Sequence, residues 1–459
     1  MTFKKQKKGV VLIICMIFLC VFSVMAVSLA QMAGSNIKSA ENYCQSNRAL
    51  ESAQSGLEVV KFWLANRTIS GNISPSQRFD AIVADIQNEL ESLGATNYVL
   101  NYDSVSNILT VDQINLDSQK NRAFSITISQ IDDDHLQADI IGTSKQFSRK
   151  IRVNFQFSTT GHSVFDFGVA TKGPLAMSGQ AELEGATVDV EASVYIEGNG
   201  ASGDAFSIVN HASVAGDVSI ANPYATYTVG SNSSVGGATG EDVHDHVFVG
   251  VDYVDFPVPN PDYFNVYATG EVINSSSDWD SFTSLNNITI AAGTNPTFAS
   301  NITINGILFI ESPNTVTFTG KAVVNGIVVG DGELDDSSYG SISFAGQVIC
   351  NDTDVLTGEQ FEAIKQETGT FIVAPGFYLD FSGQDLNMHG AIAGSGISFS
   401  GQAGGLVNGS VINYSTQPML MSGQSSLTFN RSGTVADPAG FVPEHKLLFE
   451  VDSYSELPL

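Results

Sequence analysis

The chain has 459 residues, and its 48 acidic against 20 basic side chains give a formal net charge of −28. Such a surplus of negative charge argues against nucleic acid as a partner, because it would repel the phosphates. Only 15% of the residues are charged, and the many Gly, Val, Ile, Thr, Ser and Asn residues are typical of an exported, mainly β protein with room for two or three domains.

The first predicted element is a membrane-spanning helix behind a basic leader, residues 1–9. Residues 10–30 are twenty-one consecutive residues without a charged side chain. At about 1.5 Å per residue they would span roughly the 30 Å hydrocarbon core of a bilayer. The lysines before the span favour a cytoplasmic amino terminus, so we expect the remainder of the chain to be extracytoplasmic.

The helix is predicted to continue beyond the span. Residues 31–63 contain no proline, and apolar side chains recur mostly every three or four residues. This spacing places them on one helical stripe. The stripe comprises Ile37, Ala40, Cys44, Leu50, Ala53, Leu57, Val60 and Leu64. Residues 10–66 are therefore predicted to form one transmembrane and amphipathic helix.

Two segments carry a resemblance to a known family. Residues 4–14 (KKQKKGVVLII) and residues 47–58 (NRALESAQSGLE) resemble the amino-terminal segment of type IV pilus minor pilins of the PilX kind. The resemblance implies cleavage between Gly9 and Val10, an inner-membrane location and packing of the helix against other pilin-like subunits in a pilus. Ile14 stands at the fifth mature position, where major pilins carry Glu, which points away from a major subunit.

Two other interpretations of the amino terminus remain open. Ser28-Leu29-Ala30 fits a signal-peptidase site, although the apolar run is longer than a usual signal sequence. The segment would also suit a simple one-pass anchor of an unrelated surface protein. Both interpretations keep the same topology.

Residues 67–160 are predicted to form a small α+β domain of the pilin type. Helical spacing predicts a helix over residues 77–93, with Gly94 just past its end. The period then changes to two, which predicts an antiparallel meander of strands over residues 107–116, 124–131, 135–141 and 150–157.

Residues 161–440 repeat a unit of Phe, small residue, Gly or Ser and a polar residue, followed by Asn-Gly or His-Gly. Full copies begin at Phe298, Phe318, Phe381 and Phe399, and partial copies begin at Met177, Phe344 and Met421. Spacings of 20, 18 and 22 residues, from Phe298 to Phe318, Phe381 to Phe399 and Phe399 to Met421, suit one coil of a parallel β-helix, a β-solenoid. The longer gaps on either side of Phe344, of 26 and 37 residues, indicate insertions from the coils. An antiparallel sandwich is the alternative, but it would not require one tetrapeptide at coil spacing.

In such a solenoid equivalent side chains stack from coil to coil. We therefore predict an internal structural ladder of Phe298, Phe318, Phe344, Phe381 and Phe399, with Gly at tight corners and Asn stacked or in left-handed conformations.

Several segments do not fit the repeat. Loop insertions are predicted near residues 237–265, 330–340 and 350–375, the last with a surface helix over residues 357–366. Residues 441–459 lack the repeat and are expected to cap the last coil or form a tail.

Metal sites have weak sequence support. Asp331, Glu333 and Asp335 alternate as Ca²⁺ ligands can, although the spacing of a twelve-residue calcium loop is missing. His244 and His246 stand among acidic residues, a pattern that a solvated loop explains as well. We expect no cofactor, with Ca²⁺ as the one candidate.

Catalysis is not predicted. Arg431 is the only arginine after Arg152, and catalytic motifs such as Gly-x-Ser-x-Gly and His-Glu-x-x-His do not occur. The sequence favours a non-enzymatic, pilus-related envelope protein that displays its solenoid for structural or adhesive contact with glycans or proteins. The alternative is a secreted or membrane-anchored carbohydrate-active or glycan-binding β-helix protein.

Overall fold

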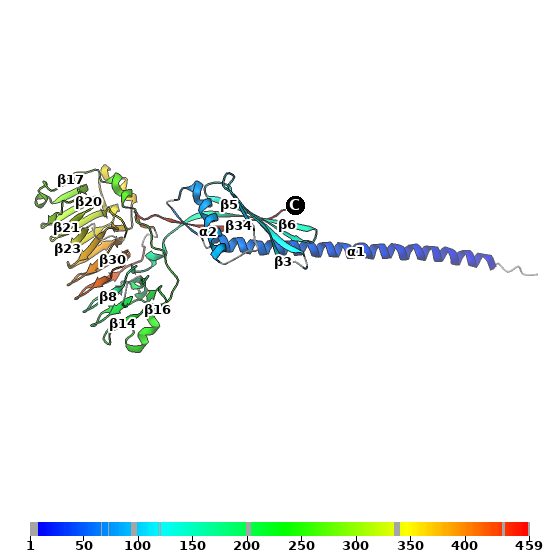
Figure 1. Cartoon of the computed structure of the whole chain (residues 1–459), viewed down its shortest axis with the longest axis horizontal. Coiled ribbons are helices and arrows are strands. Elements are labelled where there is room, and N and C mark those ends of the chain that lie inside the picture. Colours follow the sequence, from blue (N-terminus) through cyan, green and yellow to red (C-terminus); the bar gives the residue numbers. More distant parts are fainter. Residues whose placement is uncertain are drawn as a thin grey trace, which may run out of the picture. The chain divides into compact units, whose positions relative to one another are not determined.

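A computed structural model describes residues 8–65, 67–71, 73–92, 99–117, 119, 121–198, 203–334, 340–433 and 437–457. The chain divides into two compact units. The first comprises residues 1–159 together with residues 445–459, and the second comprises residues 160–444. Figure 1 shows helices and antiparallel strands in the first unit and stacked short strands in the second.

The first unit is built on α1 (Lys8–Ala65), a continuous helix of 58 residues (Figure 1). Its amino-terminal half is exposed, and Ile37 of the predicted stripe is 68% exposed. Burial begins at Gln45 and then follows the predicted spacing through Ala53, Leu57 and Val60. The stripe therefore contacts the protein only in its carboxyl-terminal half.

The sheet of this unit has the strand order β1-β34-β6-β5-β4-β3-β2. The strands are β1 (Thr68–Ser70), β2 (Leu100–Asp103), β3 (Ile108–Asp117), β4 (Arg122–Gln130), β5 (His135–Ser144), β6 (Phe147–Thr160) and β34 (Glu444–Leu457). Strands β3 to β6 pair antiparallel in succession, as the period of two predicted. The second helix, α2 (Arg78–Ser92), follows a short 3-10 turn, η1 (Pro75–Gln77), and Leu93 and Gly94 lie outside the described residues.

The helix α1 and the sheet approach closely because two glycines face the contact. A Cβ on Gly56 would lie 2.7 Å from Ile140, and a Cβ on Gly142 would lie 2.1 Å from the carbonyl oxygen of Ala49. Around this contact Leu57, Phe124 and Ile140 belong to one buried apolar cluster.

The carboxyl-terminal segment does not cap the last coil, so that prediction is wrong. Residues 444–457 form β34, which lies between β1 and β6 in the sheet of the first unit. Leu447 is buried in the apolar cluster of that unit, and Phe449 packs against Phe155 of β6. The segment pairs there because it satisfies the backbone groups of β6 on the side away from β5. The second unit is thus an insertion between neighbouring strands of the first.

The second unit is a β-solenoid, as predicted, and it has three faces. The described strand pairs that join neighbouring coils are parallel. We name the faces the strap face, the hydroxyl face and the amide face. The strap face contains β7 (Val169–Thr171), β10 (Val194–Ile196), β13 (Val218–Ile220), β16 (Val247–Val249), β17 (Val272–Ile273), β25 (Thr370–Ala374), β28 (Ala391–Gly394) and β31 (Val411–Asn413).

The other faces follow the same stacking. The hydroxyl face contains β8 (Leu175–Met177), β11 (Phe206–Ile208), β14 (Tyr227–Val229), β19 (Thr297–Phe298), β21 (Asn314–Phe318), β23 (Gly340–Phe344), β26 (Phe377–Phe381), β29 (Ile397–Phe399) and β32 (Met419–Met421). The amide face contains β9 (Glu182–Gly185), β12 (Ser213–Val214), β15 (Ser234–Val235), β24 (Val348–Asn351), β27 (Leu386–His389), β30 (Gly404–Asn408) and β33 (Ser426–Phe429). The long strands β18 (Ser284–Ile290), β20 (Ile302–Ile310) and β22 (Ala322–Gly330) run from the amide face onto the strap face.

The coils do not stack in chain order, which the spacing of the repeat did not indicate. The hydroxyl face has the order β14-β11-β8-β32-β29-β26-β23-β21-β19. The chain thus starts in the middle with β7 to β9, winds to one end, crosses to the other end and winds back. The last coil, β31 to β33, then pairs with the first coil, β7 to β9. We call this contact the seam.

The crossing segment, residues 250–271, is the strap. It covers apolar side chains that point outward from the strap face. Strands of this face, such as β25, are therefore buried on both sides, and their sequences are continuous apolar runs. Phe256 packs between Tyr195 and Tyr414, and the Tyr414 hydroxyl donates to the carbonyl of Pro257. Burial raises the pKa of the Tyr414 phenol, which keeps this donor protonated.

The predicted insertions have a mixed outcome. Residues 237–265 include part of the strap, but they also contain β16, which pairs with β13 as a regular coil strand. Near residues 330–340, β22 ends at Gly330 and β23 begins at Gly340. Between β24 and β25, residues 352–369 leave the coil.

The helix predicted over residues 357–366 is wrong. That stretch contains two short 3-10 turns, and Gly358 has a φ of 115°, which excludes a helical start after Thr357. Among the described residues of the second unit, the short 3-10 helices are η2 (Ser163–Asp166), η3 (Asp189–Ala192), η4 (Gly240–His246), η5 (Pro261–Tyr267), η6 (Trp279–Ser281), η8 (Thr353–Val355), η9 (Glu359–Phe361) and η10 (Ile364–Gln366).

Candidate functional surfaces

The apolar half of α1 is a surface without cover in the isolated chain. An 18-residue window of this helix has a mean hydropathy of 2.9 and none of it is buried, so the helix is long and apolar enough to cross a membrane. Side chains such as Leu12 and Phe22 are 66% and 64% exposed. The hydroxyl of Ser23 donates to the carbonyl of Leu19, so its hydrogen bond is satisfied within the helix. Such a continuous apolar surface requires lipid or other helices around it.

The predicted processing residues lie at the start of this helix. Gly9 and Val10 belong to the first turn of α1, which begins at Lys8. The rest of the basic leader, residues 1–7, lies outside the described residues. Ile14 is 46% exposed on the same apolar surface.

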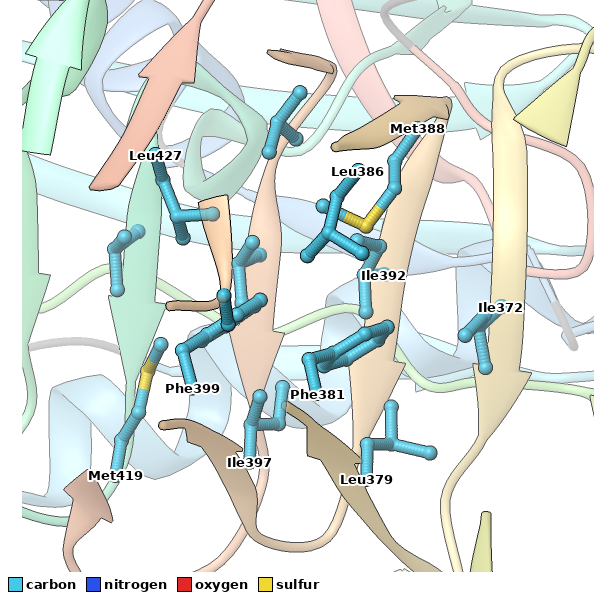
Figure 2. Packing of buried hydrophobic residues seen from close by; sticks show 14 of the residues in the cluster. Ile372, Leu379, Phe381, Leu386, Met388, Ile392, Ile397, Phe399, Met419 and Leu427 are labelled. Carbon is cyan, nitrogen blue, oxygen red and sulfur yellow. The ribbon is translucent and has the colours of Figure 1, made fainter. Parts of the chain in front are cut away.

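The predicted phenylalanine ladder is present and lies inside the solenoid. Rings of Phe298, Phe318, Phe344, Phe381 and Phe399 stack with neighbouring centroids 5.1, 5.0, 5.4 and 4.8 Å apart. All five are buried, and Figure 2 shows Phe381 and Phe399 side by side in the core. The ladder is therefore structural and presents no aromatic surface to a ligand.

The ladder crosses the seam. Phe399 is in register with Met421, and Met421 is in register with Met177 of the first coil. Steric crowding between coils explains the glycine of the repeat. A Cβ on Gly383, for example, would lie 1.8 Å from the carbonyl oxygen of Gly346 in the neighbouring coil.

Outside the core, the amide face carries two ladders of polar side chains. In the asparagine ladder, Asn351 donates to Asn325, Asn325 to Asn305, and Asn305 to Asn286, at 2.7, 2.8 and 2.9 Å. The row continues in register through His389, whose Nε2 lies 3.0 Å from Asn408 Nδ2. Asn430 then donates to Asn408 at 3.0 Å. The stacking of the repeat asparagines was predicted.

The second ladder, of glutamines, was not predicted as a surface. Gln424 donates to Gln180 at 2.9 Å across the seam, Gln402 donates to Gln424 at 3.3 Å, and Gln384 donates to Gln402. Their recurrence after Ser-Gly in the repeat was the signal for it. Because equivalent positions of successive coils lie one strand spacing apart, a repeated exposed glutamine has to stack on its neighbours.

The remaining predicted ligands do not assemble into a metal site. Within the part of the chain that the structure describes, no group of three or more His, Cys, Asp or Glu side chains could hold a metal ion. Asp331 accepts the backbone N–H of Ser312, Glu333 is exposed, and Asp335 lies outside the described residues.

The two imidazoles of the acidic loop have separate partners. The ring of His244 contacts the Tyr227 hydroxyl, whereas His246 Nδ1 lies 2.7 Å from Asp217.

At the seam a buried carboxylate joins the first and last coils. Glu191 accepts backbone N–H groups of Thr187 at 2.7 Å and of Val188 at 3.2 Å on one oxygen, and that of Arg431 at 3.1 Å on the other. Burial would raise the pKa of Glu191, but these donors together lower it, so the group stays ionised. Asn413 also bridges the seam by donating to Thr171 at 3.0 Å.

Comparison with known proteins defines the amino-terminal part. Residues 8–58 match the family described as PilX N-terminal, and with the exposed apolar helix this makes the amino terminus of the chain type IV pilin-like. No curated protein matches the sequence.

Two solved structures are similar to this chain at a low level. The competence-associated pilin ComZ from Thermus thermophilus has 14% identity and a TM-score of 0.29, over 90% of this chain and 97% of that one. A glycosylated ice-binding protein from an Arctic yeast has 11% identity and a TM-score of 0.18, over 59% of this chain and 94% of that one. Both TM-scores are too low to bear on the function of this chain.

Proposed function

We propose that this chain is a minor subunit related to type IV pili, which enters a filament through α1 and displays the β-solenoid for adhesive contact. One observation carries the proposal. The apolar half of α1 is exposed, whereas the same helix from Gln45 onward is fixed to the sheet of the first unit. A helix held at one end and apolar at the other suits transfer from lipid into the packed helices of a filament.

The route implied by this proposal begins in the inner membrane. The amino terminus is cytoplasmic, residues after the span are extracytoplasmic, and a prepilin-type peptidase cuts between Gly9 and Val10. The cut removes the basic leader and leaves the apolar helix whole. Ile14 in place of Glu supports a minor subunit, because minor pilins of the kind that this amino terminus resembles often lack the Glu of major pilins.

Amino-terminal sequencing of the protein from its native envelope tests the route. A terminus at Val10, together with recovery of the protein in sheared filaments, is the expected result. A terminus at Gln31 would mean a released, secreted protein, and an intact Met1 would leave only a membrane anchor. A Gly9→Leu variant should retain the leader, and the matched change Gly34→Leu on the exposed helix should be cleaved normally.

We propose further that the display unit is not an enzyme and needs no cofactor. The phenylalanine ladder is internal and the amide face carries mainly neutral polar side chains, which support binding rather than turnover. Incubation of the full-length protein with acidic and neutral polysaccharides should release no products, and any turnover that survives purification would reject this part of the proposal.

A further inference from the structure

The amide face has a regular chemical pattern across its width. The glutamine ladder (Gln180, Gln424, Gln402 and Gln384) borders it on one side, and the asparagine ladder borders it on the other. Between the ladders runs a central row of outward side chains in register from coil to coil. This row contains Thr303, Val323, Ile349, Asn387, Leu406 and Thr428. All six are half-buried.

The ladders keep hydrogen-bonding capacity for a ligand. An amide side chain has two N–H donors and an oxygen with two lone pairs. Each amide in the middle of a ladder uses one donor and one lone pair on its neighbours, so one of each remains. Gln384, Gln402 and Gln424 are exposed and direct these groups to solvent. The result is a row of paired donors and acceptors at roughly 4.8 Å intervals, the spacing of adjacent strands.

The central row supplies the complementary apolar contact. Leu406 offers aliphatic surface between the two ladders, and Val323 and Ile349 extend the aliphatic row beyond the end of the glutamine ladder. A sugar ring has the same division, with C–H groups on its faces and hydroxyls at its edges. A hydroxyl both donates and accepts, which matches the remaining valences of an amide better than those of a carboxylate or an ammonium group.

A depression marks the middle of this face. A cavity of about 490 Å³ opens there and is lined by Gln384, Asp385, Gln402, Gly404, Gly405, Ser426 and Thr428. It exists because Gly404 has no side chain at a position where its neighbour in the next coil is Ser426. Gly405 cannot carry one, since a Cβ would lie 1.7 Å from the carbonyl oxygen of Leu386.

Charge narrows the class of ligand. Three charged side chains in and beside the face, Asp385, Glu182 and Glu184, are acidic, and Lys321 at the glutamine position of the repeat is basic. The acidic side chains prevail here, as they do in the whole chain with its net charge of −28. An acidic polymer would be repelled, whereas a neutral one would not. The hydroxyl face is a poorer candidate, because its outward row of Thr317, Ser343 and Ser398 is interrupted by Asp380, which accepts hydrogen bonds from both serines.

We propose that the amide face binds a neutral, hydroxyl-rich polysaccharide that lies along the stacked coils. The inference rests on the proposed function and names the partner of the displayed solenoid. The glutamine ladder bonds the hydroxyl edge of the sugars, the aliphatic row contacts their C–H faces, and the depression at Gly404 receives one residue of the chain.

Co-sedimentation of the full-length protein in detergent micelles with microcrystalline cellulose and with chitin beads tests the proposal. The protein should sediment with at least one of these, and a Gln402→Ala/Gln424→Ala variant should bind about tenfold or more weakly. Each lost hydrogen bond accounts for roughly a two- to tenfold effect. The matched control is Thr297→Ala/Thr315→Ala, which truncates two exposed side chains of the hydroxyl face and should bind normally.

Three results would overturn the inference. They are no sedimentation with either neutral polymer, unchanged binding by the glutamine variant with a normal thermal unfolding profile, and stronger binding to pectate than to the neutral polymers. The first of these leaves the proposed function intact if the same protein is still cut at Val10 and recovered in filaments. Failure of the filament assay with binding retained would reject the proposed function alone.

Discussion

Phe381 lies in the middle of the interior ladder, with Phe344 and Phe399 stacked on its two sides. Its side chain is fully buried, and the neighbouring coils are tied by backbone hydrogen bonds that limit collapse around a hole. Phe381→Ala should therefore lower the free energy of unfolding of the second unit by roughly 3–5 kcal/mol. Urea denaturation followed by circular dichroism would measure it.

The matched control for this change is Leu420→Ala. Leu420 points outward from β32 and is 44% exposed, so the loss should stay within about 0.5 kcal/mol. Equal effects of the two substitutions would contradict an interior ladder.

Asp139 gives the first unit a pH-dependent contribution to its stability. Burial would raise the pKa of Asp139, but hydrogen bonds and charge from Arg152 and Lys150, each 2.7 Å away, lower it overall. The contribution is thus present above the unfolded pKa of about 3.9 and is lost as the pH falls through the lower folded pKa. Asp139→Asn should reduce the melting temperature at pH 7. The difference from wild type should begin to shrink below about pH 4 and should vanish only when the pH lies below the folded pKa of Asp139.

A matched change separates this ion pair from general charge effects. Asp133→Asn removes an exposed carboxylate from the turn before β5. It should leave the melting temperature near the wild-type value across the same range, and a parallel loss in both variants would contradict the assignment to Asp139.

The sequence predicted the positions of some residues in the structure and not those of others. The five ladder phenylalanines could be predicted, because one residue type recurred at coil spacing and the interior is the place for a repeated large apolar side chain. Asp331 and Glu333 could not be placed, since alternating acidic residues suit a calcium loop and a solvated loop equally well. The glutamine ladder was visible as a motif, but its meaning depended on knowing that the position faces outward.

The contact between α1 and β5 depends on the absence of a side chain at Gly142. Gly142→Ala would bring a Cβ within 2.2 Å of the backbone nitrogen of Ala53 as well as against Ala49. The helix and strand must then separate, so we expect a loss of about 1–3 kcal/mol in the stability of the first unit. Thermal unfolding monitored by the fluorescence of Trp63, which is buried in this unit, would report the change.

Gly34 provides the comparison within the same helix. A Cβ there meets nothing within 4 Å, so Gly34→Ala should leave stability unchanged or raise it by up to about 1 kcal/mol through helix propensity. A loss as large as that of Gly142→Ala would argue against close helix–strand contact as the cause.

Most elements followed from local pattern, and the exceptions have local causes. The long helix and the meander were predicted, because a period of 3.6 and a period of 2 are both strong over ten residues or more. The helix over residues 357–366 failed because Gly358 turns the chain away and Phe361 and Ile364 are buried in the cluster under the strap. β34 was missed because its partner β6 lies almost 300 residues earlier, and no repeat links the two.

At the seam, the first and last coils of the solenoid pair with each other. Asn413 is fully buried there, donates to Thr171 and accepts the backbone N–H groups of Gly396 and Ser415. Asn413→Ala would leave these groups without a partner, at a cost of about 2–4 kcal/mol. Hydrogen exchange should show lost protection first in β7 and β31, while amides in β20 and β22, far from the seam, keep theirs.

The order of the coils could not be predicted from the sequence. Residues 169–185 have the same short apolar runs as every other coil, and any parallel coil edge can accept another. The arrangement is fixed by specific seam contacts such as that of Glu191 with Arg431, whose residues are 240 positions apart. Such long-range closure also implies slow folding, because the chain must bring distant ends together before the contacts form.

The position of β34 has a consequence for how the protein is made. The last strand of the chain completes the sheet against which the first helix packs, and the ribosome releases it only after the whole solenoid has been synthesised. A messenger truncated anywhere in the solenoid would yield a chain that has α1 but lacks β34 from the sheet of the first unit. The sheet of the first unit can therefore be completed only after the whole second unit has been synthesised.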